Sequence, residues 1–315
     1  MTRKGWSLFA AMSVLWGLPY LFIKVAVAEV DPVVVVFVRT GLAVLVLLPI
    51  ALRRGALRHA RGRWREVLAL AVIEVTGPFL LISFGETYVP SSLAGLLVAA
   101  VPLVIAVVAF RLDPSERVTG LRLSGLVVGM VGVGTLLGLD VGADPRQLLG
   151  AGLVLLSTVG YALGAIRIKR LADVPPLGVI TALLAINTVL LAPVAAFRLP
   201  QQRPSTYVVA SLLVLGLACT ALAFPIFFAL IAEAGAGRGT VITYVNPAVA
   251  VALGVMLLGE PITAATVAGF LLIIAGSWLS TGGRLPPRRL PALTWPRPGR
   301  WTRSARSATD PEAAA

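Results

Sequence analysis

Ten long apolar segments follow one another along this chain of 315 residues, and they constrain its fold more than any other feature. Hydrophobic residues make up 58% of the sequence and charged residues only 13%, whereas soluble domains carry about 25% charged residues. A helix needs about 20 mostly apolar residues to cross a bilayer. The candidate segments are 6–28, 32–52, 66–84, 88–110, 121–139, 147–168, 176–197, 205–231, 239–258 and 262–281. The sequence therefore predicts an all-α membrane protein with ten transmembrane helices.

The basic residues predict how these helices are oriented. With the N-terminus placed inside, 22 of the 27 lysines and arginines fall on the inner side, three on the outer side and two within spans. Because inner loops are enriched in lysine and arginine, both termini are expected to be cytoplasmic, in a multi-pass protein of the cell membrane. The net charge of +13 is thus attributed to topology and not to nucleic-acid binding. Residues 3–28 also resemble a cleavable signal peptide, an alternative that the internal repeat disfavours.

The chain is similar to itself at a shift of 145 residues. "LWGLPYLFIK" (15–24) then falls on "GYALGAIRIK" (160–169), and Pro102 falls on Pro247. The agreement extends over five spans, and a repeat of an odd number of spans must be inserted in the opposite orientation. Inverted repeats of this kind form many secondary transporters, with the substrate site between the two halves.

This repeat divides the chain into three parts. Residues 1–140 and 141–282 are predicted to be two inverted five-helix repeats. Residues 283–315 are rich in proline and arginine, cannot form a core, and are predicted to be a disordered basic cytoplasmic tail that contacts anionic lipid.

Several short motifs, in order, resemble the EamA family of the drug/metabolite transporter superfamily. They are "LWG" (15–17), "RTGLAVLVLLP" (39–49), "LLGEPIT" (257–263) and "GFLLIIAG" (269–276), together with the two proline-containing spans. The resemblance implies a ten-helix carrier that moves a small organic solute (an amino acid, a metabolite or a drug), generally by efflux. One departure is "DPSERVT" (113–119), which stands where the second half has Gly-Glu.

Metal and redox chemistry is disfavoured, because the chain has one cysteine, Cys219, and one histidine, His59. A zinc site needs three or four such ligands. We expect no metal, no cofactor and no enzymatic activity. The alternatives are a membrane-embedded lipid-modifying enzyme and a membrane subunit that transports nothing. The expected partners are a small-molecule solute, membrane lipid and, as a candidate coupling ion, the proton.

Charged residues inside spans are costly and usually mark a cavity or a partner. Lys24 lies near the outer end of the first span, where extension toward lipid headgroups is the favoured interpretation. Arg39 and Glu74 lie at similar depths in the second and third spans. Either they form a structural ion pair, or Glu74 binds a proton or cation and Arg39 binds a carboxylate. Glu233 and Glu260 are expected to be solvated at span ends.

Aromatic and amide side chains complete the candidate site. Trp16 and Tyr161 occupy equivalent places in the two repeats, either as walls of a central cavity or as packing between the repeats. Asn246, before Pro247, either contacts substrate at a kink or satisfies a freed carbonyl. The predicted substrate-binding residues are Trp16, Tyr20, Arg39, Glu74, Tyr161, Tyr244 and Asn246, and the predicted hinge residues are Gly17, Pro19, Pro102 and Pro247.

Overall fold

The computed structural model describes residues 1–112, 120–141, 144–235 and 241–280. Among these residues the regular structure is entirely helical. The predicted tail, the segment "DPSERVT" and Arg238 lie outside the described residues.

The N-terminal part of the chain begins with the long helices α1 and α2. Its elements are α1 (Arg3–Val27), α2 (Pro32–Arg53), α3 (Leu57–Gly62), α4 (Trp64–Leu70), the π-helix η1 (Ala71–Thr76), α5 (Gly77–Gly85), α6 (Ser91–Val98), α7 (Val101–Leu112), α8 (Leu121–Thr135) and the π-helix η2 (Leu136–Val141).

The C-terminal part follows a similar order. Its elements are α9 (Pro145–Arg167), the 3₁₀-helix η3 (Ile168–Leu171), α10 (Pro176–Ala196), α11 (Thr206–Leu213), the π-helix η4 (Val214–Leu222), α12 (Ala223–Ala234), α14 (Ile242–Leu258) and α15 (Ala264–Ser280).

Eight helical runs in the described chain are long and apolar enough to cross a membrane, and α14 and α15 are two shorter apolar helices. All ten lie where the sequence predicts spans. Large apolar side chains such as those of Leu45, Val189 and Met256 point outward, exposed by 72%, 72% and 79%. Exposed apolar surface on this scale suits contact with lipid.

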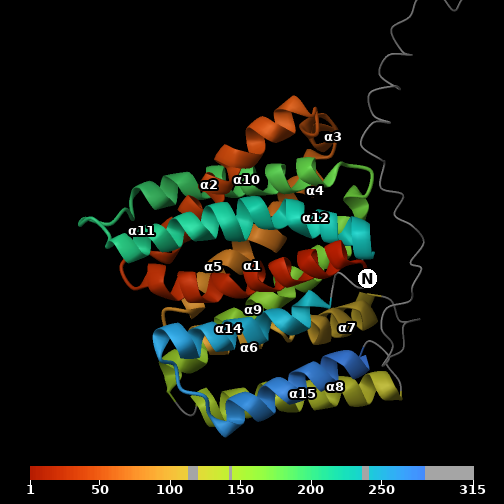
Figure 1. Ribbon diagram of the computed structural model, residues 1–315, viewed down its shortest axis with the longest axis vertical. Coiled ribbons are helices and arrows are strands. Elements are labelled where there is room, and N and C mark those ends of the chain that lie inside the picture. The colour runs from red at the N-terminus through yellow and green to blue at the C-terminus, as the bar shows by residue number, and fades with distance from the viewer. Residues whose placement is uncertain (113–119, 142–143, 236–240, 281–315) are drawn as a thin grey trace, which may run out of the picture.

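The long helices lie side by side in one bundle (Figure 1). Helix α2 packs on α10, α1 on α14, α5 on α9, and α8 on α15. The last pair forms one edge of the bundle in Figure 1, away from α2 and α10. Segments far apart in the sequence therefore become neighbours, and most of the interior is formed between the two parts of the chain.

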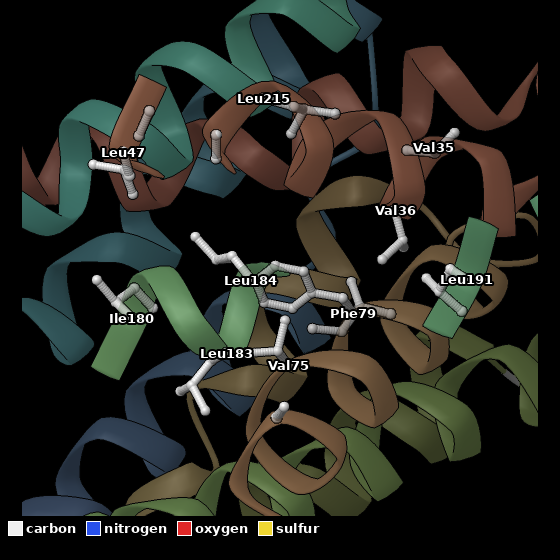
Figure 2. Packing of buried hydrophobic residues seen from close by; sticks show 14 of the residues in the cluster. Val35, Val36, Leu47, Val75, Phe79, Ile180, Leu183, Leu184, Leu191 and Leu215 are labelled. Atoms are coloured by element: carbon white, nitrogen blue, oxygen red, sulfur yellow. The ribbon is translucent and has the colours of Figure 1, made fainter. Parts of the chain in front are cut away.

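The largest apolar cluster joins α2, η1, α5, α10 and η4 (Figure 2). Leu183 and Leu184 of α10 extend toward Phe79 of α5 and Val75 of η1. Leu215 of η4 belongs to the same cluster, and η4 packs on α2. Helices in lipid gain little from the hydrophobic effect, so close packing of this kind holds them together.

Glycines bring α8 and α15 into direct backbone contact. A Cβ atom on Gly132 would lie 2.8 Å from Ile273 N and 2.9 Å from Gly269 O, and one on Gly276 would meet the backbone of Gly129. Small residues at a membrane helix interface allow this approach. The predicted fifth and tenth spans are therefore partners.

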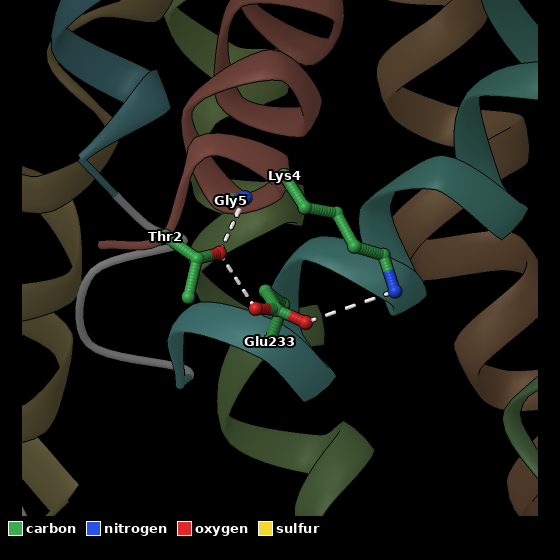
Figure 3. A network of polar contacts seen from close by, with 4 residues as sticks. All are labelled: Thr2, Lys4, Gly5 and Glu233. Carbon is green, nitrogen blue, oxygen red and sulfur yellow. Dashed lines mark hydrogen bonds and ion pairs between the residues drawn. The ribbon is translucent and has the colours of Figure 1, made fainter.

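At one end of the bundle, polar contacts join the start of α1 to the end of α12 (Figure 3). The Thr2 hydroxyl accepts from Gly5 N (3.0 Å) and donates to Glu233 Oε1 (2.7 Å). Lys4 Nζ lies 3.7 Å from Glu233 Oε2. Glu233 is therefore engaged and not simply solvated as expected from the sequence.

Candidate functional site

Arg39 lies about two turns into α2 and is 8% exposed. Its Nε donates to Thr220 Oγ1 of η4 (2.9 Å), and its guanidinium lies over the ring of Phe79, 4.1 Å from the centroid. Such a cation–π contact contributes about 0.5–2 kcal/mol. The Nε bond leaves the terminal nitrogens of the guanidinium, which carry four of its five N–H donors and suit a carboxylate.

Two tyrosines belong to the same neighbourhood. Tyr20 of α1 and Tyr161 of α9 are close enough to Arg39 to interact with it electrostatically, as is Cys219 of η4. Tyr161 also interacts electrostatically with Glu74. Four of the seven predicted binding residues therefore surround one region, to which α1, α2, η1 and α9 each contribute one side chain.

Glu74 lies on the π-helix η1 and turns toward α9. A Cβ atom on Gly164 would collide with its carboxylate, so the carboxylate rests on the backbone of α9. Its Oε2 is buried without a hydrogen-bond partner in the part of the chain that is described. No ion pair joins Glu74 to Arg39 among these residues, so the structural pairing considered from sequence does not form.

Trp16 packs in an aromatic cluster with α12. Its ring centroid is 5.9 Å from that of Phe224 and 4.7 Å from that of Phe227. Trp16 and Tyr161 therefore have different surroundings: Trp16 packs on α12, whereas Tyr161 lies near Arg39 and Glu74.

Asn246 lies where α14 crosses α1. In the amide orientation that satisfies its polar atoms, Nδ2 donates to Ser13 O (3.3 Å) and Ile242 O (3.0 Å). A Cβ atom on Gly17 would lie 2.6 Å from Val249 and 3.0 Å from Asn246 O. Asn246 and Gly17 thus take part in helix packing, and Tyr244 lies in the first turn of the same helix.

The predicted hinge prolines differ in setting. Pro102 stands in the first turn of α7, just after the break between α6 and α7. Pro19 and Pro247 lie inside the continuous helices α1 and α14. A hinge is thus better supported at Pro102 than at the other two positions.

Lys24, expected to extend toward headgroups, and Glu260, expected to be solvated, both make contacts within the protein. Lys24 Nζ donates to the carbonyl oxygens of Glu86 (2.7 Å) and Val89 (2.9 Å) and does not extend to headgroups. Glu260 Oε1 accepts from Ser91 N (2.7 Å) and Oγ (2.9 Å), and Oε2 accepts from Ser92 N (2.9 Å). Lys24 therefore binds the segment that joins α5 to α6, and Glu260 binds the first turn of α6.

The chain matches one protein-family model twice, once in each part. The EamA-like transporter family matches residues 3–138 and again residues 148–282. The chain belongs to the EamA-like transporter family. The resemblance read from the short motifs is confirmed, and membership makes this a membrane protein related to transporters.

Curated relatives of this EamA-like chain carry transporter names. "Uncharacterized transporter YvbV" of Bacillus subtilis (strain 168) is 26% identical over 271 residues, covering 85% of this chain and 88% of its own. "Probable amino-acid metabolite efflux pump" of Salmonella typhimurium (strain LT2) is 27% identical over 301 residues, covering 90% and 96%. A solved crystal structure with 20% identity covers 89% of this chain and 97% of its own, with a TM-score of 0.64, which supports the fold alone.

Three neighbours of the site were not predicted. Phe79 and Thr220 contact Arg39 directly, but neither residue type is unusual inside a span, so nothing in the sequence pointed to them. Glu86 follows the last residue of a span and reads as a solvated loop residue, yet it is fully buried. The two buried charged residues of the described chain, Arg39 and Glu86, both lie in its N-terminal part.

Proposed function

We propose that this EamA-like protein is a secondary transporter that exports a small organic solute bearing a carboxylate, such as an amino acid or a related metabolite. Transport would proceed by alternating access, with the two halves of the chain opening the site to each side of the membrane in turn. The efflux name of the Salmonella relative supports this direction and this substrate class.

The observation that carries the proposal is the buried guanidinium of Arg39. A buried cation is costly unless it is paired, and Arg39 is held by a neutral hydroxyl and an aromatic ring. No carboxylate forms an ion pair with it in the described chain. A carboxylate on the solute would supply the missing negative charge in a site that also contains two tyrosines.

Two inverted repeats are supported by equivalent helix irregularities. A shift of 145 residues carries the π-helix η1 (71–76) onto residues 216–221, inside the π-helix η4. The shift places Glu74 on Cys219. π-Helical segments are rare and frequently lie at functional sites, so a matched pair beside Arg39 is consistent with a duplicated site.

Helix pairing has the reciprocal form that two related halves require. Helices α2 and α10 are equivalent under the shift and pack on each other, as do α8 and α15. The pairing of α1 with α14 has its counterpart in the pairing of α9 with α6 and α7. Such reciprocal contacts suit an alternating-access carrier, because the halves can exchange their conformations.

Glu74 is the proposed coupling group. Its carboxylate is held against α9 with one oxygen unpartnered, and it shares the neighbourhood of Tyr161 with Arg39. A proton on Glu74 would neutralise a charge that is costly inside a membrane. Exchange of a proton for the solute would then drive export.

Efflux from preloaded cells tests the function. Cells expressing wild type, Arg39→Lys, Glu74→Gln or the control Glu66→Gln are loaded with a panel of amino acids, nucleosides and cationic dyes, and release is followed at two external pH values. Glu66 lies two turns before Glu74 and is partly exposed, with its Oε1 3.6 Å from Nη1 of Arg170. Its replacement is therefore expected to leave transport unchanged. The amount of each protein in the membrane fraction is measured in parallel.

The proposal expects wild type to export one carboxylate-bearing class, Arg39→Lys to lose that export, and Glu74→Gln to lose its pH response. Export of cationic dyes alone would contradict the role of Arg39. Equal behaviour of Glu74→Gln and Glu66→Gln would remove Glu74 as the coupling group. Absence of export of any solute by abundant wild-type protein would favour a membrane subunit or enzyme instead.

A further inference from the structure

Glu86 is a buried carboxyl that nothing assigned above uses. It follows the last residue of α5, where the chain turns toward α6, and its exposed fraction is 0%. Neither Oε1 nor Oε2 has a hydrogen-bond partner in the part of the chain that the structure describes. Buried polar groups are nearly always hydrogen-bonded, so a doubly unpartnered carboxyl calls for a specific reason.

The charged groups around Glu86 come from three other elements. Lys24 of α1 and Glu260, from the segment between α14 and α15, interact with it electrostatically, and Arg39 of α2 does so more weakly. Tyr20 of α1 also lies within electrostatic range. The Lys24 ammonium directs two of its protons to the carbonyl oxygens of Glu86 and Val89.

Glu260 connects the two halves at this end of the bundle. Its carboxylate accepts three hydrogen bonds at the N-terminus of α6, from the backbone and hydroxyl of Ser91 and the backbone of Ser92. A helix N-terminus carries partial positive charge and favours an anion. Partial burial opposes ionisation, but the hydrogen bonds from Ser92 and Ser91 outweigh it and lower the pKa of Glu260.

When Glu86 is ionised, the carboxylates of Glu86 and Glu260 both act electrostatically on one ammonium, that of Lys24. Like charges in a site of low dielectric repel strongly, and an ionised Glu86 would also compete with the carbonyl oxygens for Lys24. Burial raises the pKa of the Glu86 carboxyl well above its usual range, and Lys24 opposes this rise. With a proton on Glu86, the contacts made by Lys24 and Glu260 are compatible with one another.

We propose that Glu86 is a proton-binding site, and that loss of its proton releases the contact between Glu260 and α6 so that this end of the transporter opens. This inference depends on the proposed function in one respect: it assumes that the two ends of the protein open in turn. Protonated Glu86 keeps this end closed, and ionised Glu86 opens it. In the orientation that the arginines predict, this end faces the outside.

Infrared spectroscopy tests the proton directly. Purified full-length protein is titrated between about pH 5 and pH 9, which brackets the raised pKa values of buried carboxyl groups. The measurement uses a Glu74→Gln background, because Glu74 is itself proposed to bind a proton. In that background the C=O band of a protonated carboxyl is expected at low pH, absent after Glu86→Gln and retained after Glu29→Gln. Glu29 lies at the same end, is exposed, and accepts from Ser205 N (2.7 Å). A band that does not titrate, or that survives in Glu86→Gln, overturns the proposal.

Cysteine labelling tests the opening. In a Cys219→Ala background, Ala250→Cys places a reporter on α14 that is 1% exposed. It lies one turn before Gly254, which packs on Glu260 and Ser91. A second reporter, Leu96→Cys, replaces a side chain that is 0% exposed by a smaller one, so a reporter that disturbs folding can be replaced.

Labelling by a maleimide is measured in lipid nanodiscs, where both faces are accessible. Rates are divided by that of Tyr207→Cys, which is 82% exposed, because thiolate formation itself rises with pH. The normalised rate is expected to rise by up to about tenfold per pH unit below the midpoint. In Glu86→Gln the rate should stay low, and in Glu260→Gln it should be high at every pH.

Neither measurement needs a transported solute, so the two proposals can fail separately. A labelling rate that follows pH equally in wild type and Glu86→Gln refutes the role of Glu86 while leaving transport intact. The protein could instead export none of the tested solutes while Glu86→Gln still loses the pH response of labelling. That result supports the proton site at Glu86 and contradicts only the transport proposal.

Discussion

Replacing Gly132 by alanine is expected to weaken the packing of α8 on α15. The new Cβ would lie 2.8 Å from both Ile273 N and Leu272 Cβ and 2.9 Å from Gly269 O, where 3.4 Å is an ordinary contact. These neighbours are backbone atoms and a Cβ, which cannot rotate away. The helices must therefore separate by about 0.5 Å, and a gap of that size already forfeits about a quarter of the dispersion energy of the contacts that it opens.

The expected cost of this overpacking is about 1–3 kcal/mol, equivalent to about 5- to 150-fold in the unfolding equilibrium. Gly134→Ala is the matched control, because it lies on the same helix with nothing within 4 Å of the new Cβ. Both variants replace glycine by alanine in the same helix and gain the same helix propensity. The difference between their stabilities therefore reports the packing cost alone. Unfolding of the purified proteins is followed against increasing SDS. A midpoint for Gly132→Ala equal to or above that of Gly134→Ala would refute the reasoning.

Three further outcomes are expected. The pKa of Glu260 is lowered in the folded protein, so its ionised form stabilises the fold fully above the usual glutamate pKa of about 4.3. This stabilisation is lost as the pH falls through the pKa of Glu260 in the folded protein. The acid unfolding of Glu260→Gln should therefore depend less on pH than that of wild type. Phe79→Leu should remove the cation–π contact with Arg39 and cost about 0.5–2 kcal/mol, seen as a lower midpoint in thermal unfolding. Glu233→Gln should abolish the ion pair with the exposed Lys4, with a loss of no more than about 1 kcal/mol that added salt removes in wild type.

The helices were predictable because their cause is local. Lipid requires every backbone group in a span to be satisfied within the segment, so length and apolar content are sufficient to locate each span. The positions where helices become irregular were harder to predict. A π-helix such as η1 depends on the packing of neighbouring helices, and nothing in the segment "AVIEVT" indicates one. Pro102 was a better guide, since proline restricts the residues before it, and the helix does break there.

The candidate site was predictable only where a residue is rare in its setting. Arg39 and Glu74 were found because charges inside spans are unusual, and both lie in the same region as Tyr161. Of the two alternatives for this pair, the ion pair does not form in the described chain, because depth in the membrane says nothing of which face of a helix a side chain occupies. Glu86 and Glu260 were missed or misread because a carboxylate beside a loop looks solvated until the packing of other helices buries it.

The two halves of this chain have the same helix order but not the same buried charges. Arg39 and Glu86 have as equivalents, at the shift of 145 residues, Leu184 and Ile231, and Glu74 has Cys219. A carrier assembled from two identical subunits would contain each of these ionisable side chains twice. The free-energy cost of burying each charge would then also arise twice. Joining the halves in one chain makes each copy separately mutable, so ionisable residues can be kept in one half while the other carries uncharged residues at the equivalent positions.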